Sequence, residues 1–248
     1  MKIKSCFIIL FYCLPLYALI IETDNFDVII QQANSDTLVI FDIDNTIARP
    51  YTALGSDEWF CYLVDQKIAQ GYDYISAIYA VLPLVYYVQF HVPLMLTDPA
   101  LPSLFSLFQQ TGINTLALTS RSLYLAERTH KQLKDIGITF TLNNCLIDEY
   151  IFPLLHPCLY KYTMIFCGNN NKGDILLTFL DLINYLPKKI IFIDDKMSHV
   201  KAVESALSLT DIEYIGIRYT GCDHYIHNFD PAQAQEQWDA IKVHNITA

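Results

Sequence analysis

Four short apolar runs, separated by longer amphipathic stretches, constrain the fold of this chain more than any other feature of its sequence. Each run is rich in β-branched residues and is bounded by polar ones, as buried strands are. The stretches between the runs, such as residues 122–137, have the spacing of amphipathic helices. We therefore predict an α/β fold in which a parallel sheet carries helices on both faces. The runs are DTLVIFDID, INTLALTS, KKIIFIDD and IEYIGIRYT, at residues 36–44, 113–120, 188–195 and 212–220.

Three of these runs end in polar residues that can carry chemistry. Asp42 and Asp44 end the first run, and Asp194 and Asp195 end the third. The carboxyl ends of parallel strands meet at one edge of a sheet, where α/β proteins bind their ligands. Carboxylates crowded at that edge repel one another unless a cation is present. Mg²⁺ held by a few carboxylates relieves the repulsion and leaves room for a phosphate group. The second run ends in Thr119, Ser120 and Arg121.

This set of residues contains every group that phosphoryl transfer needs. Asp42 can attack phosphorus as a nucleophile. Asp44 can protonate the leaving oxygen and then deprotonate the attacking water. Thr119 and Lys172 can hold the phosphoryl oxygens and offset their charge. A solvated turn after the strand is the competing interpretation of the aspartates, and a surface lysine near a helix start is that of Lys172.

The motifs DIDNT, LALTSR, NKGD and IFIDDK, in that order, resemble those of the haloacid dehalogenase (HAD) superfamily of phosphatases and phosphotransferases. The resemblance implies a HAD-like, Rossmann-related fold and Mg²⁺ as cofactor. It implies that Asp42 is the nucleophile and a metal ligand, and that Asp44 is the acid/base, with its backbone carbonyl also on the metal. It gives Thr46 the task of holding the Asp44 loop. In the fourth motif, Asp195 is the first choice as metal ligand and Asp194 the second.

The residues expected to contact substrate are Ser120, Asn45 and Arg121, although a surface salt bridge is an equal alternative for Arg121. A closer resemblance is to a family of exported HAD-like proteins of unknown function from intracellular Gram-negative bacteria. It rests on FDIDNTIARP with LGSDEWF, on ALTSRS, and on KGDILLTFL with KKIIFIDDK. The TSR step and the leader are also similar to those of secreted class B and class C acid phosphatases. The sequence departs from the superfamily pattern at Ser198 and His199, where many members carry a further acid or Asn.

The N-terminal 21 residues are predicted to be a signal peptide or an N-terminal anchor. Lys2 and Lys4 precede an apolar run that reaches about Ile21, and Ala18 is a small residue suited to cleavage. A membrane anchor and a buried helix are the alternatives. Export to the periplasm or beyond is therefore expected, with residues 22–248 as the HAD-like domain. Five cysteines follow the leader, an odd number that leaves at least one thiol free or bridged between chains.

Two inserts interrupt the expected sheet. The first, about 48–110, is rich in tyrosine and leucine and is predicted to be a helical cap. Within it, residues 75–96 are apolar enough to suggest a membrane span, but prolines and polar residues interrupt them. Asp57 and Glu58 begin a predicted cap helix and either reach the site or only cap the helix. The second insert, about 139–166, is predicted to form strands, and CDHYIH at residues 222–227 a surface loop.

We therefore predict a Mg²⁺-dependent hydrolase that acts on a small-molecule phosphomonoester through an aspartyl-phosphate. The alternative is a catalytically weak HAD-fold protein that binds a host protein or a membrane through its cap. The net charge of −10 argues against nucleic acid as a partner. Contact with a membrane through the leader or the apolar cap stays open. The complete catalytic set favours the enzyme.

Overall fold

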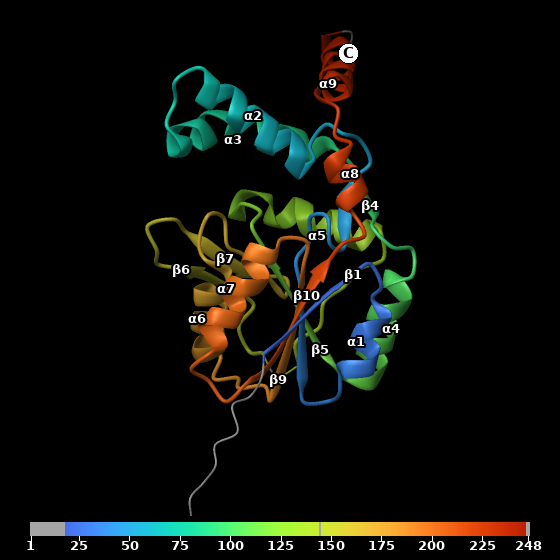
Figure 1. Ribbon diagram of the computed structural model, residues 1–248, viewed down its shortest axis with the longest axis vertical. Coiled ribbons are helices and arrows are strands. Elements are labelled where there is room, and N and C mark those ends of the chain that lie inside the picture. The colour runs from blue at the N-terminus through green and yellow to red at the C-terminus, as the bar shows by residue number, and fades with distance from the viewer. Residues whose placement is uncertain (1–17, 144, 247–248) are drawn as a thin grey trace, which may run out of the picture.

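An eight-stranded, mostly parallel sheet forms the centre of the computed structural model, which describes residues 18–143 and 145–246 (Figure 1). The strand order is β1-β10-β9-β2-β5-β8-β7-β6, and among these strands only β7 runs antiparallel to its neighbours, β6 and β8, near one edge. The expected parallel sheet is confirmed. The strands are β1 (Leu19–Thr23), β2 (Thr37–Phe41), β5 (Asn114–Thr119), β6 (Glu149–Phe152), β7 (Cys158–Lys161), β8 (Met164–Phe166), β9 (Lys189–Asp194) and β10 (Glu213–Tyr219).

Helices cover both faces of the sheet, as the continuous apolar runs predict (Figure 1). Alternate residues of β2 point to opposite faces: Val39 and Phe41 join one core cluster, and Leu38 and Ile40 join the other. All four side chains are fully buried. On the first face lie α1 (Asp27–Gln32), α4 (Leu101–Thr111) and α5 (Ala126–Asp135), the last preceded by the 3-10 turn η1 (Leu123–Leu125); on the second lie α6 (Lys172–Leu182) and α7 (Met197–Leu207).

The N-terminal boundary differs from the predicted one. Residues 19–21, assigned to the leader by sequence, belong to β1, which pairs with β10 at the sheet edge. The strand begins directly after Ala18, the small residue suited to cleavage. The sheet therefore includes residues that precede the predicted domain start at residue 22, since an apolar edge strand and the end of a leader have similar compositions. Residues 1–17 of the expected leader lie outside the described residues.

Only part of the first insert forms a separate lobe, which lies above the carboxyl edge of the sheet (Figure 1). The last part of the predicted cap, residues 101–110, instead belongs to α4, whose apolar residues pack in the main-domain core. Two antiparallel strands, β3 (Ala48–Pro50) and β4 (Leu94–Leu96), join the lobe to the main domain. Its helices α2 (Asp57–Ala69) and α3 (Tyr74–His91) share a cluster of buried apolar residues. In the part of the chain that is described, no helix is long and apolar enough to cross a membrane. Pro83 lies inside α3, which continues through it.

The C-terminal segment also belongs to the cap, which the sequence did not indicate. After β10 the chain forms α8 (Asp223–His227) and then α9 (Pro231–Ile246). Ala234 is buried in the cap cluster, and the side chain of Gln237 accepts a hydrogen bond from the Leu54 amide at 2.9 Å. The prediction of a loop at CDHYIH is wrong, because residues 223–227 make one helical turn that leads the chain from the sheet to the cap.

The second insert contains strands, as predicted, and β7 and β8 pair antiparallel as a hairpin. Its first apolar stretch, residues 138–142, forms no strand. Two hydrogen bonds nevertheless join this stretch to β5: the Thr115 amide donates to the Thr141 carbonyl, and the Thr141 amide donates to the Thr115 hydroxyl. The five cysteines after the leader are all free thiols.

Candidate active site

The parallel register brings three of the predicted motifs together. Phe41, the last residue of β2, lies beside Ala117 of β5 and Ile193 of β9. Asp194, Asp42 and Thr119 therefore lie in that order along the carboxyl edge of the adjacent strands β9, β2 and β5. The Asp42 amide donates to the Ile193 carbonyl at 2.8 Å, which extends the ladder one residue beyond the end of β2.

Lys172 joins two of the carboxylates. It is the first residue of α6, and the Asn171 side chain caps this helix by accepting from the amides of Gly173 and Asp174. The Lys172 Nζ lies 2.6 Å from Asp42 Oδ1 and 2.7 Å from Asp194 Oδ2, and the lysine is 2% exposed. A cation at a helix N-terminus is disfavoured by the helix dipole, so these ion pairs supply the compensating interaction.

The two carboxylates that flank Lys172 differ in acidity. Burial raises the pKa of Asp42 to about 6, although the charge of Lys172 acts in the opposite direction. For Asp194, burial also raises the pKa, but Lys172 and His199 outweigh it and bring the value to about 2. Asp194 has more donors: its Oδ2 receives Lys172 and lies 3.0 Å from His199 Nδ1, and its Oδ1 accepts from the Lys196 amide at 2.7 Å.

Asp195 is the carboxylate without such partners. It is 6% exposed, and within the described residues its side chain accepts no hydrogen bond. Burial and the neighbouring charges of Asp194 and Asp42 raise its pKa to about 9. Its backbone amide donates to the Thr46 hydroxyl at 3.0 Å, which ties the loop after β2 to the end of β9.

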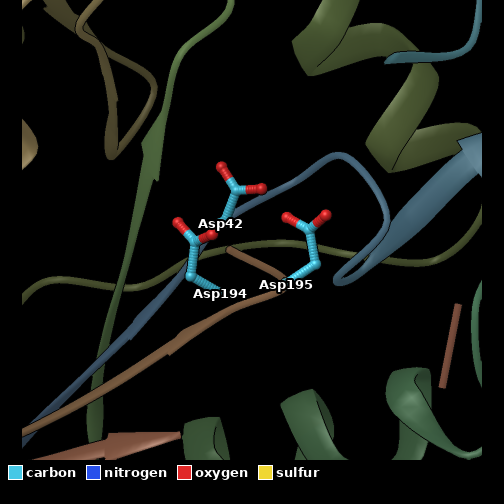
Figure 2. Close-up of side chains that lie close together, drawn as sticks. All are labelled: Asp42, Asp194 and Asp195. Atoms are coloured by element: carbon cyan, nitrogen blue, oxygen red, sulfur yellow. The ribbon is translucent and has the colours of Figure 1, made fainter. Parts of the chain in front are cut away.

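The carboxylates of Asp42, Asp194 and Asp195 lie close together at the sheet edge (Figure 2). One oxygen of each lies within 4.8 Å of those of the other two. Burial and the repulsion among these carboxylates raise the pKa of Asp42 and of Asp195, and a divalent cation would offset both effects. Carboxylate oxygens are also the ligands that Mg²⁺ prefers. The residues present therefore fit this cation.

Arg121 does not lie on the surface, which was one of its two sequence interpretations. It is 5% exposed, and its guanidinium forms a two-pronged ion pair with Asp44, with Nε and Nη2 each 2.8 Å from a carboxylate oxygen. Burial raises the pKa of Asp44, but the charge and hydrogen bonds of Arg121 more than offset this and leave the pKa lowered. Contact of Arg121 with a substrate stays a prediction.

The other expected site residues differ in their burial and in their hydrogen-bond partners. Thr119 is fully buried, and its hydroxyl accepts from the Arg121 amide at 3.1 Å. Asn45 is buried with a left-handed backbone (φ 56°), and its amide donates to Glu58 of the cap at 2.7 Å. Ser120 is exposed. Whether these residues touch a substrate stays a prediction.

A cavity of about 680 Å³ opens between the cap and the main domain, with Asp195 in its wall. Asp57, Glu58 and Tyr62 of α2 form one side, and Arg218 of β10 lies in the lining with Ile226 and Phe229 of the C-terminal segment. The size suits a small-molecule ligand.

The family was identified by comparison with known proteins. The family model "Protein of unknown function (DUF2608)" matches residues 22–247. The chain belongs to the DUF2608 family. A relative from Chlamydia muridarum named "Putative outer membrane protein" is 27% identical over 206 residues, which cover 83% of this chain and 77% of the relative. An uncharacterised protein of Rickettsia prowazekii is 27% identical over 220 residues, which cover 83% and 79%.

One solved structure, titled as a "putative beta-phosphoglucomutase" from Thermotoga maritima, has 14% sequence identity and a TM-score of 0.41 to this DUF2608 protein. The match covers 77% of this chain and 99% of the other. A likeness at this level carries no inference about activity. What the DUF2608 chain does must come from its own residues.

Sequence reasoning missed several residues of this DUF2608 site. His199, singled out only as a departure from pattern, contacts Asp194, and its position one turn into α7 is the signal that could have revealed it. Lys196 forms an ion pair with Asp57 of the cap at 2.8 Å. No local sequence signal pairs those two, because they are far apart in the chain.

Proposed function

We propose that this protein is a Mg²⁺-dependent phosphomonoester hydrolase that acts through an aspartyl-phosphate on Asp42. The observation that carries the proposal is the buried Lys172 ammonium between Asp42 and Asp194, beside the unpaired Asp195 in the cavity wall. A structural ion pair would explain Lys172 alone. It would not explain a third carboxylate in the cavity wall, whose pKa is raised by burial and by the charges of Asp194 and Asp42, because a cation bound there would offset that repulsion.

The chain's own residues would perform the reaction in two steps. An oxygen of Asp42 forms a bond to phosphorus as the bond to the leaving oxygen breaks, and Asp44 gives that oxygen a proton. Asp44 then takes a proton from water, whose oxygen attacks phosphorus and releases Asp42. Lys172 and the Thr119 hydroxyl would hold the phosphoryl oxygens. Asp44 must leave Arg121 to take part, because the guanidinium occupies both of its oxygens.

Asp42 and Asp195, with the backbone carbonyl of Asp44, would hold Mg²⁺. Asp194 is the poorer candidate as a direct ligand, because both its oxygens already accept hydrogen bonds. When bound, Mg²⁺ would neutralise the carboxylates and polarise the phosphoryl group.

Export stays part of the proposal. Relatives from Chlamydia muridarum and Chlamydia trachomatis carry the name "Putative outer membrane protein", which supports a location outside the cytoplasm. The alternative role, as a binding protein, is supported by exposed apolar residues on the cap. Tyr74, Ile75, Tyr79 and Phe90 of α3 are all at least half exposed.

The test is hydrolysis of p-nitrophenyl phosphate by the chain without its leader, in Mg²⁺ and in EDTA. We expect metal-dependent turnover that Asp42→Asn abolishes. Asp36→Asn is the matched control, because Asp36 is exposed and its ion-pair partner is the exposed Lys188. Turnover that survives in Asp42→Asn would refute the nucleophile. A folded chain that binds Mg²⁺ but hydrolyses no ester in a broad phosphomonoester panel would favour the binding role.

A further inference from the structure

The Arg121 guanidinium has three side-chain partners, Asp44, Thr129 and Gln132, and the last two lie away from the carboxylates. Besides the pair with Asp44, its Nη1 donates to Thr129 Oγ1 at 3.1 Å and to Gln132 Oε1 at 3.2 Å. Thr129 and Gln132 lie three residues apart on one face of α5, and both are buried. The guanidinium is therefore fixed by a helix of the main domain.

Gln132 extends this network into the cap. Its Nε2 donates to the carbonyl of Gln89 at 3.1 Å and to that of Val92 at 2.7 Å. Gln89 lies in the last turn of α3, and Val92 caps it. Carbonyls at a helix end have no partner within the helix. A buried glutamine thus uses its oxygen for Arg121 and its nitrogen for the end of the cap helix.

We propose that Arg121 and Gln132 are positioning residues that couple the end of cap helix α3 to the carboxylate of Asp44. The chain of contacts runs through direct hydrogen bonds from the α3 carbonyls through Gln132 and Arg121 to both oxygens of Asp44. A shift of α3 changes how Arg121 holds the Asp44 carboxylate. In turn, release of Asp44 from Arg121 loosens the end of α3. The consequence for catalysis rests on the proposed function; the coupling itself does not.

Thr129 provides the matched comparison. Thr129→Val removes a contact of Arg121 but none to the cap, whereas Gln132→Met removes the link to the cap and keeps a similar volume. Gln132→Glu keeps an acceptor for Arg121 but replaces the donor to α3 by a carboxylate oxygen, which cannot donate to the α3 carbonyls and adds a negative charge beside Arg121. The three variants separate loss of the cap link from general loosening of Arg121.

The experiment is amide hydrogen exchange, read at residues 88–92, with and without Asp44→Asn. Coupling is reciprocal, so we expect Asp44→Asn to speed exchange there by about five-fold or more. The effect should persist in Thr129→Val and vanish in Gln132→Met and in Gln132→Glu. The proposal would be overturned if the exchange rate at residues 88–92 does not change in Asp44→Asn. It would also be overturned if the change persists in both Gln132 variants.

Kinetics add a second readout if the chain is a phosphatase. Gln132→Met should lower kcat about five-fold with little change in KM, because it affects how Asp44 engages rather than how substrate binds. Arg121→Lys should lose the coupling although it keeps the positive charge, since an ammonium cannot hold both carboxylate oxygens as the guanidinium does. An equal loss of kcat in Thr129→Val and Gln132→Met would contradict a specific cap link. Absence of turnover in every variant would count against the proposed function and leave the exchange result to decide the coupling.

Discussion

Replacing Lys172 by methionine should destabilise the metal-free protein strongly. The change removes the ammonium from two ion pairs whose side chains are 1%, 7% and 0% exposed for Lys172, Asp42 and Asp194. Breaking a buried pair by deleting one partner costs roughly 3–5 kcal/mol, since a charge stays buried without compensation. Asp42 limits the loss, because its pKa of about 6 lets it take up a proton. We therefore expect the low end, about 3 kcal/mol near pH 7.

The assay is urea unfolding in EDTA, followed by circular dichroism, with the free energy of unfolding compared between variants. Lys188→Met is the control, because Lys188 pairs with Asp36 at 2.7 Å but is 80% exposed, and such pairs contribute less than about 1 kcal/mol. Adding Asp194→Asn to Lys172→Met should recover part of the loss by removing the second charge. A loss for Lys172→Met no larger than that for Lys188→Met would refute the electrostatic account of this site.

Three further predictions follow from other parts of the structure. In EDTA, the free energy of unfolding should fall as pH rises from about 5 to 9, because the folded state holds a proton on Asp195 up to a pKa of about 9, whereas the unfolded state releases it near the ordinary carboxyl pKa of 3.8. Urea unfolding across this range should show a flatter profile for Asp195→Asn, and an unchanged slope would contradict the prediction. Gly173→Ala should cost about 2 kcal/mol or more in the same assay, because the new Cβ would lie 2.4 Å from the Ala202 carbonyl oxygen where α6 packs on α7, and a neutral result would show that the helices separate easily. Deleting residues 231–248 should leave the sheet folded but raise amide exchange in α2 and α3, since α9 covers the cap cluster, and unchanged cap protection would refute this.

Much of the main domain could be predicted from periodicity alone. The four apolar runs all became strands of the parallel sheet, because residues buried on both faces must be apolar whichever neighbours they meet. Their polar ends could be expected to converge, since parallel strands put their carboxyl ends at one edge. The grouping of Asp42, Asp194 and Asp195 follows from those two rules.

The sequence by itself determined which residues are available at the sheet edge, but only the tertiary structure decided how they pair. Lys172 bridges Asp42 and Asp194 and leaves Asp195 unpaired, and Arg121 turns inward to Asp44. The packing of α9 on the cap was equally out of reach. Periodicity and strand-end rules are local, and they specify which face or edge a residue occupies. The choice of partner depends on distances of a few tenths of an ångström between segments remote in the chain, and these are set when helices, sheet and cap pack together.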